Sequence, residues 1–414
     1  MAYWGSLALS IFQDAPAVVR ALSPNEPVIL NRPQAAARAA RFFVEKFPGK
    51  SLYAVKANPS PELIGALWAA GITHYDTASI VEVRLVREVA GPDAVLCFMH
   101  PVKPAAAIAE AYHVHGVRTF SLDTHEELEK IVEATRDADG NPATDLSLCV
   151  RLRVSSEYSE LSLAAKFGVD LVDAAPLLQA ARQVADCLGI CFHVGSQAMT
   201  PFAYVQAMER ARAAIVDASV TVDIIDVGGG FPSIYPGMTP PPLEDYFGAI
   251  HRAFESLPVS YSSELWCEPG RALSAEYNSM IVQVEKRRGN ELFINEGAYG
   301  ALYDAAHVDW RFPVRRITPE GAVSEIGEGA DFAFYGPTCD DADFMEGPFV
   351  LPEGIQPGDY IEIGMLGAYG AAMRTRFNGF GAGLTVDAGD EPMASQYRGD
   401  RRDPRVSDNV VRLR

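Results

Sequence analysis

Residues 51–76 read SLYAVKANPSPELIGALWAAGITHYD and contain the pattern that decides the fold. A short apolar run at Leu52–Val55 is followed by helical periodicity at Pro61–Ala70 and by a second short run at Thr73–Asp76. Short apolar runs joined by a helix are typical of neighbouring parallel strands. The stretch therefore predicts one strand–helix–strand unit.

The same alternation continues toward the C-terminus. Six further candidate strands are Val95–Phe98, Thr119–Leu122, Leu146–Leu152, Ile190–Val194, Val222–Val227 and Glu264–Trp266. The helical segments between them include Ile80–Val89, Pro104–His115, Thr124–Thr135, Ala174–Cys187 and Tyr204–Val216. Eight strands separated by helices predict an α/β fold, a TIM (β/α)8 barrel over residues 26–272. A doubly wound open sheet is the alternative.

After Arg271 the pattern changes to the alternation of antiparallel strands, with frequent Pro and Gly between the segments. Examples are Ser279–Lys286, Glu291–Asn295 and Tyr360–Ile363. We predict a second, β-rich domain over residues 273–388. Residues 389–414 mix charges with few large apolar side chains and predict a flexible tail.

Composition narrows the function classes. With 414 residues the chain is long enough for two domains, and its formal net charge of −19 disfavours nucleic acid and anionic membrane as partners. The six cysteines form no CxxC pair and no cluster with histidines, so we expect neither a disulfide scaffold nor a metal site. No apolar run reaches the roughly 18–20 residues that span a bilayer, and we expect a cytoplasmic protein.

In a parallel barrel, functional groups lie just past the C-terminal ends of the strands. The residues found at these positions are Lys56, Asp76, Arg153, His193, Gly228–Gly230 and Glu268–Arg271. We expect them to converge on one rim of the barrel. The convergence of these residues on one rim is stronger evidence for a functional site than any single residue.

Three of these side chains suit an aldehyde cofactor with a pyridine ring. Partial burial would lower the pKa of Lys56 and make its amine a better nucleophile toward the aldehyde, although a lone lysine at a strand end is commonly structural. Glu268 could pair with a protonated pyridine nitrogen, or be a surface residue beside a turn. His193 could stack on the ring, or be structural.

The glycines suit a phosphate. Gly228–Gly230 offers bare backbone amides where barrels often bind one, although a tight turn is the commoner reason for three glycines. Gly270 and Arg271 could add an amide and a guanidinium to the same phosphate.

Nine motifs occur as an ordered set between about Leu30 and Phe380: YAVKANP from Tyr53, YDTAS from Tyr75, KFG from Lys166, FHVGSQ from Phe192, DVGGGFP from Asp226, CEPGRAL from Cys267, YGPTCDDAD from Tyr335, GAYG from Gly367 and FNGF from Phe377. The set resembles the alanine-racemase-fold (fold type III) decarboxylases that use pyridoxal 5'-phosphate (PLP). Within that group, TCDDAD and FNGF resemble ornithine/lysine decarboxylases more than diaminopimelate decarboxylases. The resemblance implies decarboxylation of a basic amino acid to CO2 and a diamine, as in polyamine biosynthesis.

The resemblance also implies roles by position. Lys56 would bind PLP as a Schiff base, Glu268 would pair with the ring nitrogen, His193 would stack on the ring, and Cys339 would be the catalytic acid. Phosphate ligands would be Ser196, Gly229, Gly230, Gly270, Arg271 and Tyr369, and the residues that brace the cofactor and lysine would be Asp76, Glu82 and Arg153. Residues 1–25 would join the β-rich domain. The family implies a head-to-tail homodimer in which Cys339 and Asp340 enter the partner's site.

Substrate choice should depend on carboxylates for a distal ammonium, for which Asp304, Asp340 and Asp343 are the candidates. Between Tyr369 and Phe377 the sequence departs from the family, and Arg374 or Arg376 could receive a carboxylate or face water. A decarboxylase of diaminopimelate, carboxynorspermidine or another modified amino acid is therefore an alternative. A catalytically inactive homologue that acts as a regulatory binding protein is a more distant one.

Overall fold

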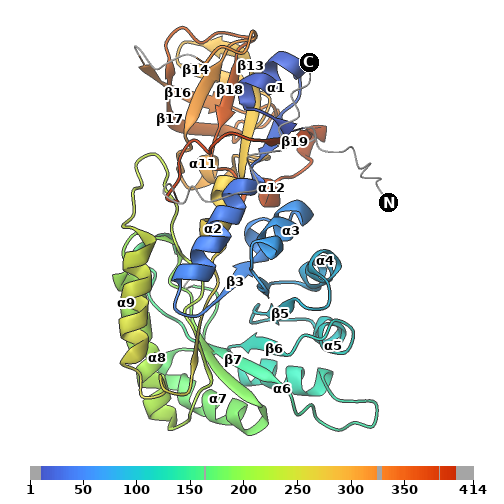
Figure 1. The fold of residues 1–414 in the computed structure, drawn as a ribbon, viewed down its shortest axis with the longest axis vertical. Coiled ribbons are helices and arrows are strands. Elements are labelled where there is room, and N and C mark those ends of the chain that lie inside the picture. Colours follow the sequence, from blue (N-terminus) through green and yellow to red (C-terminus); the bar gives the residue numbers. More distant parts are fainter. Residues whose placement is uncertain (1–10, 163–164, 324–328, 382, 398–414) are drawn as a thin grey trace.

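The computed structural model describes residues 11–162, 165–323, 329–381 and 383–397. Within them, eight parallel strands close into a barrel, which confirms the predicted α/β fold (Figure 1). In barrel order the strands are β3 (Lys50–Ala54), β4 (His74–Thr77), β5 (Val95–Phe98), β6 (Thr119–Leu122), β7 (Ser147–Arg151), β9 (Cys187–Cys191), β11 (Ile224–Asp226) and β12 (Glu264–Cys267). The barrel closes where β12 pairs in parallel with β3.

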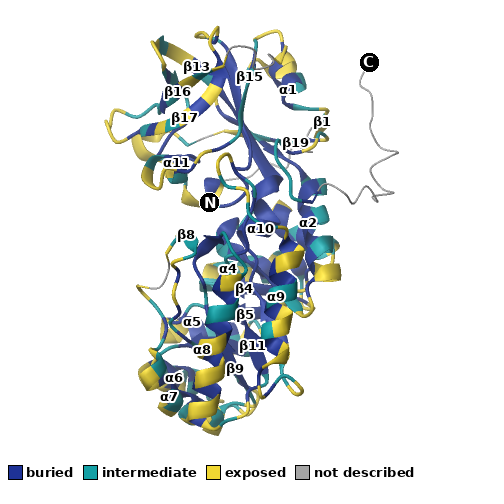
Figure 2. Cartoon of the chain, turned by 90° about the vertical axis from the view of Figure 1, so that its left-hand side faces the viewer, coloured by how far each residue is buried: buried dark blue, intermediate teal, exposed yellow. Residues whose placement is uncertain are grey.

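Helices surround the barrel and expose their outer faces (Figure 2). They are α2 (Pro33–Lys46), α3 (Pro61–Ala69), α4 (Ile80–Ala90), α5 (Ala105–His113), α6 (His125–Ala134), α7 (Leu171–Val184), α8 (Phe202–Ala218) and α9 (Leu243–Glu255). Two of them begin at a side-chain cap, because Ser79 and Thr124 each accept a hydrogen bond from the backbone amide three residues on. Each cap lies two residues after the end of the preceding strand, so a short turn joins strand to helix at these two places.

The barrel interior contains thiols. Cys97, Cys149 and Cys191 are buried there with Leu52 and Trp266. Burial raises the pKa of the Cys149 thiol well above its ordinary value, so this group is an unreactive core residue. The six cysteines are unpaired, and Cys339 differs from the others because it is exposed.

The second unit is a mixed sheet that includes both ends of the described chain. Its main path runs β1 (Ile11–Phe12), β19 (Leu384–Ala388), β2 (Val28–Asn31), β13 (Asn278–Arg288), β14 (Glu291–Ile294), β16 (Gly329–Tyr335) and β17 (Phe344–Pro352). β18 (Tyr360–Ile363) pairs with β13 and with β15 (Val314–Ile317). β2 belongs to this sheet, although its residues fall inside the range predicted for the barrel. Short helices α1 (Ala15–Leu22) and α11 (Tyr303–His307) accompany the sheet.

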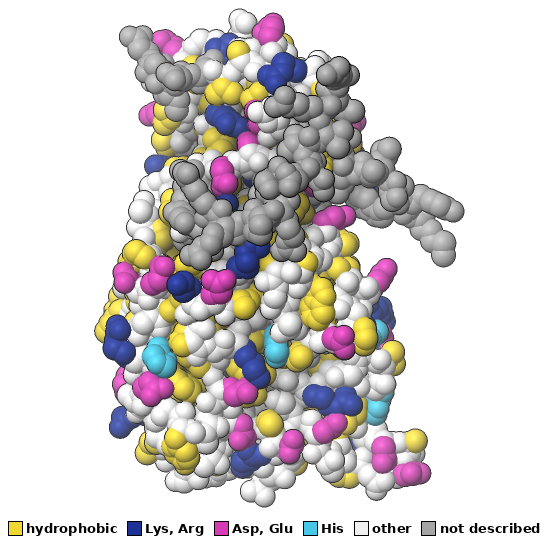
Figure 3. Space-filling view, in the orientation of Figure 1, with side chains coloured by type: hydrophobic (Ala, Val, Ile, Leu, Met, Phe, Trp, Pro, Cys, Tyr) yellow, Lys and Arg dark blue, Asp and Glu magenta, His cyan; other side chains and the backbone are white. Residues whose placement is uncertain are grey.

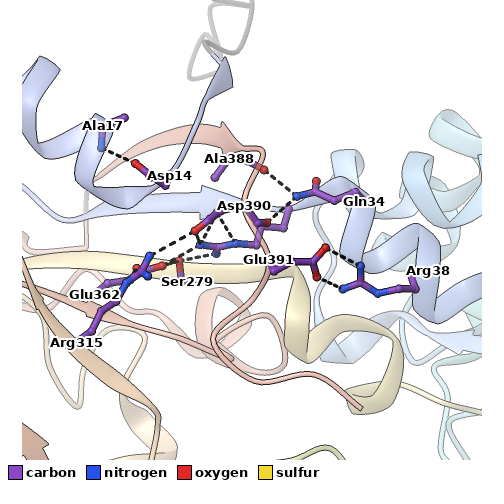
Figure 4. A network of polar contacts seen from close by, with 11 residues as sticks. Asp14, Ala17, Gln34, Arg38, Ser279, Arg315, Glu362, Ala388, Asp390 and Glu391 are labelled. Carbon is purple, nitrogen blue, oxygen red and sulfur yellow. Dashed lines mark hydrogen bonds and ion pairs between the residues drawn. The ribbon is translucent and has the colours of Figure 1, made fainter. Parts of the chain in front are cut away.

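Residues 389–397, which we call the C-terminal strap, pack against the rest of the chain (Figure 4). Asp390 lies 2.9 Å from the buried Arg32, which also pairs with the buried Glu362 at 2.9 Å. Arg315 bonds to Glu362 at 2.5 Å. The expectation of a loose segment from residue 389 is therefore wrong for the strap, because its charges meet opposite charges that the sequence pattern did not pair with them. Residues 398–414 of the predicted tail lie outside the described residues.

Charges of both signs are interspersed over the barrel face seen in Figure 3. This distribution is typical of a solvated surface. Among the described residues, none of the helices is long and apolar enough to cross a membrane.

Glu276 is a buried carboxyl group at the junction of barrel and sheet. One of its oxygens accepts the amide hydrogen of Gln396 at 3.0 Å, and the other lies 3.6 Å from Arg38. Burial raises the pKa of Glu276 from 4.5 to about 7. The folded state therefore binds more protons than the unfolded state between these values, and the contribution of Glu276 to stability falls as the pH rises through this window.

We expect Glu276→Gln to raise the thermal midpoint at pH 8 by a few degrees, in line with a penalty on the order of 3 kcal/mol for a shift of this size. At pH 5 the substitution should change the midpoint little, because the wild-type carboxyl is already protonated there. Calorimetry at the two pH values measures the difference. An equal effect at both would contradict the assigned titration.

Candidate active site

Lys56 lies in a single 3-10 turn, Val55–Ala57, directly after β3. Its amine is 3.5 Å from the Asp76 carboxylate at the end of β4, and its side chain is partly exposed. Burial lowers the pKa of Lys56, but Asp76, Tyr369 and Glu268 outweigh it, so the pKa is raised above the ordinary value. The expected lowering is therefore wrong: the carboxylates that surround the amine keep it protonated until a ligand changes that charge balance.

Two carboxyl groups are buried together on the side of β11 and β12. Glu268 follows β12, and Asp226 ends β11. Burial and the neighbouring Asp226 raise the pKa of Glu268 well above its usual range, and burial raises that of Asp226 to about 6. Asp226 Oδ2 has no hydrogen-bond partner among the described residues. Asp226 Oδ1, in contrast, accepts the Gly228 amide hydrogen at 2.9 Å. A ligand could therefore provide a proton donor to the Oδ2 side of this buried pair.

His193 follows β9 and is held as a neutral ring. Its Nδ1 accepts a hydrogen bond from the Gly195 amide at 3.1 Å, which places any ring proton on Nε2. Burial lowers the pKa of His193 well below its ordinary value, and the positive charges of Lys56 and Arg151 add to this effect. An uncharged imidazole beside the Lys56 amine suits stacking on a flat ring.

The glycine loop after β11 has no space for side chains. A Cβ on Gly229 would lie 2.8 Å from the Glu268 carbonyl oxygen and 2.9 Å from His193 Nε2. Gly230 has φ +99°, and a Cβ there would lie 2.4 Å from the Gly195 oxygen. The backbone of Gly229 and Gly230 thus approaches the site closely, where bare amides can meet a ligand, whereas the Gly228 amide donates to Asp226 at 2.9 Å.

Arg271 brings a buried cation to this loop. It begins the short helix α10 (Arg271–Ser274), with its guanidinium 3.4 Å from Ser196 Oγ and 3.2 Å from the Tyr235 hydroxyl. Ser196 begins strand β10 (Ser196–Ala198). The rings of Trp310 and Tyr369 lie 4.3 and 5.0 Å from the guanidinium carbon. A buried guanidinium, a hydroxyl and bare amides together form an anion site, which we call the phosphate cradle: Ser196, Gly228–Gly230 and Gly270–Arg271.

Tyr369 connects the sheet unit to the site. Its amide donates to the Ala57 carbonyl oxygen at 2.7 Å, one residue after Lys56. The Tyr369 ring also lies beside the Arg271 guanidinium of the phosphate cradle. Residues from both structural units therefore complete one site at their junction.

These residues fit the predicted PLP. The cradle matches a phosphate, and the carboxyl pair with the unpartnered Asp226 oxygen matches a protonated ring nitrogen. Lys56 would hold the aldehyde carbon, and neutral His193 would contact the ring. The fit rests on the chemistry of the groups present.

Arg153 does not lie in this site. Strand β7 ends at Arg151, and Arg153 instead pairs with Asp170 at 3.1 Å, with a side chain 40% exposed. Gly168 packs against the Arg153 backbone and leads the chain to Asp170. The residue that meets the site is Arg151, whose charge acts on Lys56 and His193. The rule of inspecting strand ends would have found Arg151 if the strand had been ended two residues earlier.

Asp226 was also missed by the sequence analysis, although it stands inside the quoted DVGGGFP motif. His100, which follows β5, is a further neighbour that was not predicted. Burial lowers its pKa, and the charges of Lys103, Lys166 and Lys56 lower it further. Its position at a strand end was the available signal.

Cys339 and Asp340 lie on an exposed loop of the sheet unit. The Cys339 thiol is 3.4 Å from the side-chain oxygen of Asn378, in the FNGF motif. Asp340 accepts a hydrogen bond from the Tyr299 hydroxyl at 2.5 Å. The structure therefore groups Cys339 and Asp340 with each other, in a cluster separate from the contacts of Lys56.

The other predicted substrate residues separate into two kinds. Asp343 is buried and accepts hydrogen bonds from the Ala298 amide at 2.7 Å and from the Thr338 amide and hydroxyl. Its oxygens hold this loop in the single chain, and its role in substrate binding stays a prediction. Asp304, in α11, lies 3.6 Å from Arg271 and is mostly buried. It is the candidate carboxylate that faces the site.

Arg374 uses one side of its guanidinium inside the sheet unit, while its Nε has no hydrogen-bond partner among the described residues. It bonds to the buried Glu296 at 2.5 Å. Arg376, in contrast, is exposed. Arg376 thus faces water, as one of the two alternatives expected, and binding of a ligand carboxylate by Arg374 stays a prediction.

Comparisons with known proteins show the family of the chain. Residues 34–275 match the family model described as "Pyridoxal-dependent decarboxylase, pyridoxal binding domain". The lysine/ornithine decarboxylase of Selenomonas ruminantium is 30% identical over 348 residues, which cover 82% of this chain and 84% of that protein.

Two solved structures superpose over most of the chain. The arginine decarboxylase of Paramecium bursaria Chlorella virus, bound to agmatine, has a TM-score of 0.78 at 25% identity and covers 89% of this chain and 98% of its own. The lysine/ornithine decarboxylase of Vibrio vulnificus, complexed with cadaverine, has a TM-score of 0.76 at 27% identity and covers 92% of this chain and 100% of its own.

Proposed function

This chain belongs to the pyridoxal-dependent decarboxylases, and from that premise we propose that it decarboxylates a basic amino acid of the ornithine or lysine type. The products would be CO2 and a diamine, as polyamine synthesis requires. One observation carries the proposal: the Lys56 amine meets the Asp76 carboxylate 3.5 Å away on the rim where the carboxyl pair and the phosphate cradle also lie.

PLP, when bound, supplies the electron sink that accepts the electron pair of the breaking bond to the substrate carboxylate. Lys56 would bind the cofactor covalently and yield its place to the substrate amine. Glu268, supported by Asp226, would keep the ring nitrogen protonated, which maintains the sink. Neutral His193 would support the ring face without adding a charge.

We assign the proton that returns to the substrate α-carbon to Cys339. A thiol carries a proton that it can donate in general acid catalysis. The assignment requires Cys339 to approach a Lys56 site, and in a single chain its thiol is exposed and contacts Asn378.

We therefore propose a head-to-tail homodimer in which Cys339 and Asp340 complete the partner's site. Apolar side chains are exposed beside this loop, including Met373, Phe377 and Phe380 at 39%, 42% and 44%. The Phe377 ring lies 4.8 Å from the Tyr299 ring, and Tyr299 in turn bonds to Asp340. A second copy would cover this patch and bring the thiol to the rim.

We place the protein in the cytoplasm, where thiols stay reduced. Its six cysteines are unpaired, and Cys339 must remain a thiol to donate a proton.

For substrate choice, we assign the distal ammonium to Asp304. Burial raises the pKa of this carboxyl, while the nearby Arg271 opposes the shift. A partly desolvated carboxylate suits an organic cation and penalises a neutral side chain. A distal carboxylate, as in diaminopimelate, would be repelled there, and Arg374 is already paired with Glu296.

The test is a substrate panel followed by CO2 release: ornithine, lysine, arginine, meso-diaminopimelate and the neutral norleucine. We expect Asp304→Asn to lower kcat/KM for the preferred basic amino acid by about 10- to 100-fold, the value of a hydrogen bond to a charged group, and to leave norleucine nearly unchanged. Asp331→Asn, on an exposed position of β16, is the matched control.

Highest turnover of meso-diaminopimelate by the wild type would overturn the choice of a basic substrate. An equal loss for norleucine would show that Asp304 acts through Arg271 and the cofactor instead.

A further inference from the structure

The C-terminal strap begins at the sheet and first fastens to α2 and the residues before it. The Gln34 side-chain amide donates to the carbonyl oxygens of Ala388 and Asp390, both at 3.0 Å. Asp390 pairs with Arg32, and Glu391 pairs with Arg38 at 2.9 Å (Figure 4). This first half of the strap is thus held by charges at the junction of the two units.

The second half reaches the barrel. The Gln396 side chain donates to the carbonyl oxygen of Pro232 at 3.0 Å, and its backbone amide donates to Glu276. The Tyr397 hydroxyl donates to the carbonyl oxygen of Ala272 at 2.7 Å. The Tyr397 ring is buried and lies 5.3 Å from the ring of Phe42. Burial of so large a ring fixes the end of the strap in place.

These contacts fall beside the phosphate cradle on both of its sides. Pro232 comes two residues after Gly230, at the end of the glycine loop, and Ala272 is the residue after Arg271. The Gln396 and Tyr397 side chains also bond to each other at 3.1 Å. Two adjacent strap residues therefore link the loop that presents bare amides to the helix that presents the guanidinium.

We propose that the C-terminal strap is a positioning element for the phosphate cradle, with Gln396 and Tyr397 holding its two halves in register. The inference rests on the proposed assignment of the cradle to the PLP phosphate. A pre-arranged anion site binds more tightly because fewer groups must be ordered on binding. Neither residue touches the ligand site directly, so both are positioning residues. By linkage, a bound phosphate should in turn hold the strap in place.

The experiment compares the affinity of apoprotein variants for PLP and for pyridoxal, which lacks the phosphate. The absorbance of the Lys56-linked cofactor reports binding of both. In a chain ending at Gly389, we expect PLP to bind about 10- to 100-fold more weakly, the range found when groups that orient ligand-binding residues are removed. Pyridoxal should bind as it does to the wild type, since it does not use the cradle.

The matched control is a chain ending at Tyr397, which keeps the strap and should bind PLP within about twofold of the full chain by the same reasoning. The double variant Gln396→Ala, Tyr397→Phe keeps the length of the chain and serves if the chain ending at Gly389 does not fold. Glu391→Gln, at an exposed ion pair of the strap away from the cradle, should have little effect. Limited proteolysis of the strap, with and without PLP, measures the linked effect.

An equal loss of PLP and pyridoxal affinity would assign the strap to general stability and overturn the inference. Unchanged PLP affinity in the double variant would overturn it as well. If the wild-type protein itself does not prefer PLP over pyridoxal, the assignment of the cradle fails, and the inference fails with it. These results are distinguishable, because the last concerns the wild type and the others concern only the variants.

Discussion

A Lys56→Ala protein should lose more than about 1000-fold of the wild-type turnover, because it would lack the amine proposed to bind the cofactor covalently and to take part in proton transfer. It should also lose the absorbance of linked cofactor that borohydride fixes in the wild type. The measurements are CO2 release and the spectrum of protein reconstituted with PLP, before and after borohydride. We expect this loss at Lys56 because its amine lies 3.5 Å from Asp76, on the same rim of the barrel as the Asp226–Glu268 carboxyl pair.

Lys50 is the matched control, since it lies on the same strand at the opposite end of the barrel. Its amine bonds to Glu264 at 2.7 Å and is well exposed. Lys50→Ala should keep both the spectrum and the turnover. A borohydride-fixed label that persists in Lys56→Ala would place the cofactor on another lysine. A wild-type protein that never acquires the label would favour the reading of an inactive regulatory homologue.

Cys339→Ala should lower kcat by about 100- to 10,000-fold, the usual contribution of a positioned acid. The spectrum of bound cofactor should be retained, because Cys339 is not needed to hold PLP. Cys187→Ala is the control, at a half-buried thiol where β9 begins. A Cys339→Ala enzyme with near-normal kcat would assign the proton to a different donor.

The stronger test mixes the two inactive proteins. If each site takes Lys56 from one chain and Cys339 from the other, a mixed dimer of Lys56→Ala and Cys339→Ala contains one intact site and one doubly altered site. Random re-association of equal amounts should therefore restore about a quarter of the wild-type activity. Activity that stays at the level of the separate variants, with mixed dimers verified by mass, would show that each chain builds its own site.

The barrel was predictable because its strands are buried on both faces and each is followed by a helix. That arrangement leaves a periodicity that can be read locally, as at residues 51–76. The position of Lys56, His193 and Glu268 at strand ends followed from the same rule. Their electrostatics did not, because the direction of the Lys56 pKa depends on Asp76 and Glu268, which approach it from other strands.

The errors have a common cause in contacts between distant segments. Arg151 is the last residue of β7, and Arg153 lies two residues beyond it. Only the exact end of the strand decides which of the two arginines meets the site. In the sequence, Asp343 and Asp304 are both acidic residues of the second unit, and nothing distinguishes them. In the structure, the Asp343 carboxylate accepts hydrogen bonds from the amides of Ala298 and Thr338. The strap was expected to be loose because it has many charges and few large apolar side chains. Its ion-pair partners, such as Arg32, lie near the other end of the sequence and could not be identified from the local pattern.

The pairing of β19 between β1 and β2 has a consequence for biosynthesis. A ribosome releases the barrel strands long before it releases residues 384–388, so the barrel can collapse early while the sheet still lacks an inner member. During that interval the edges of β1 and β2 stay unpaired and open to association with other chains. Nascent chains stalled before residue 384 should therefore be the ones most in need of a chaperone.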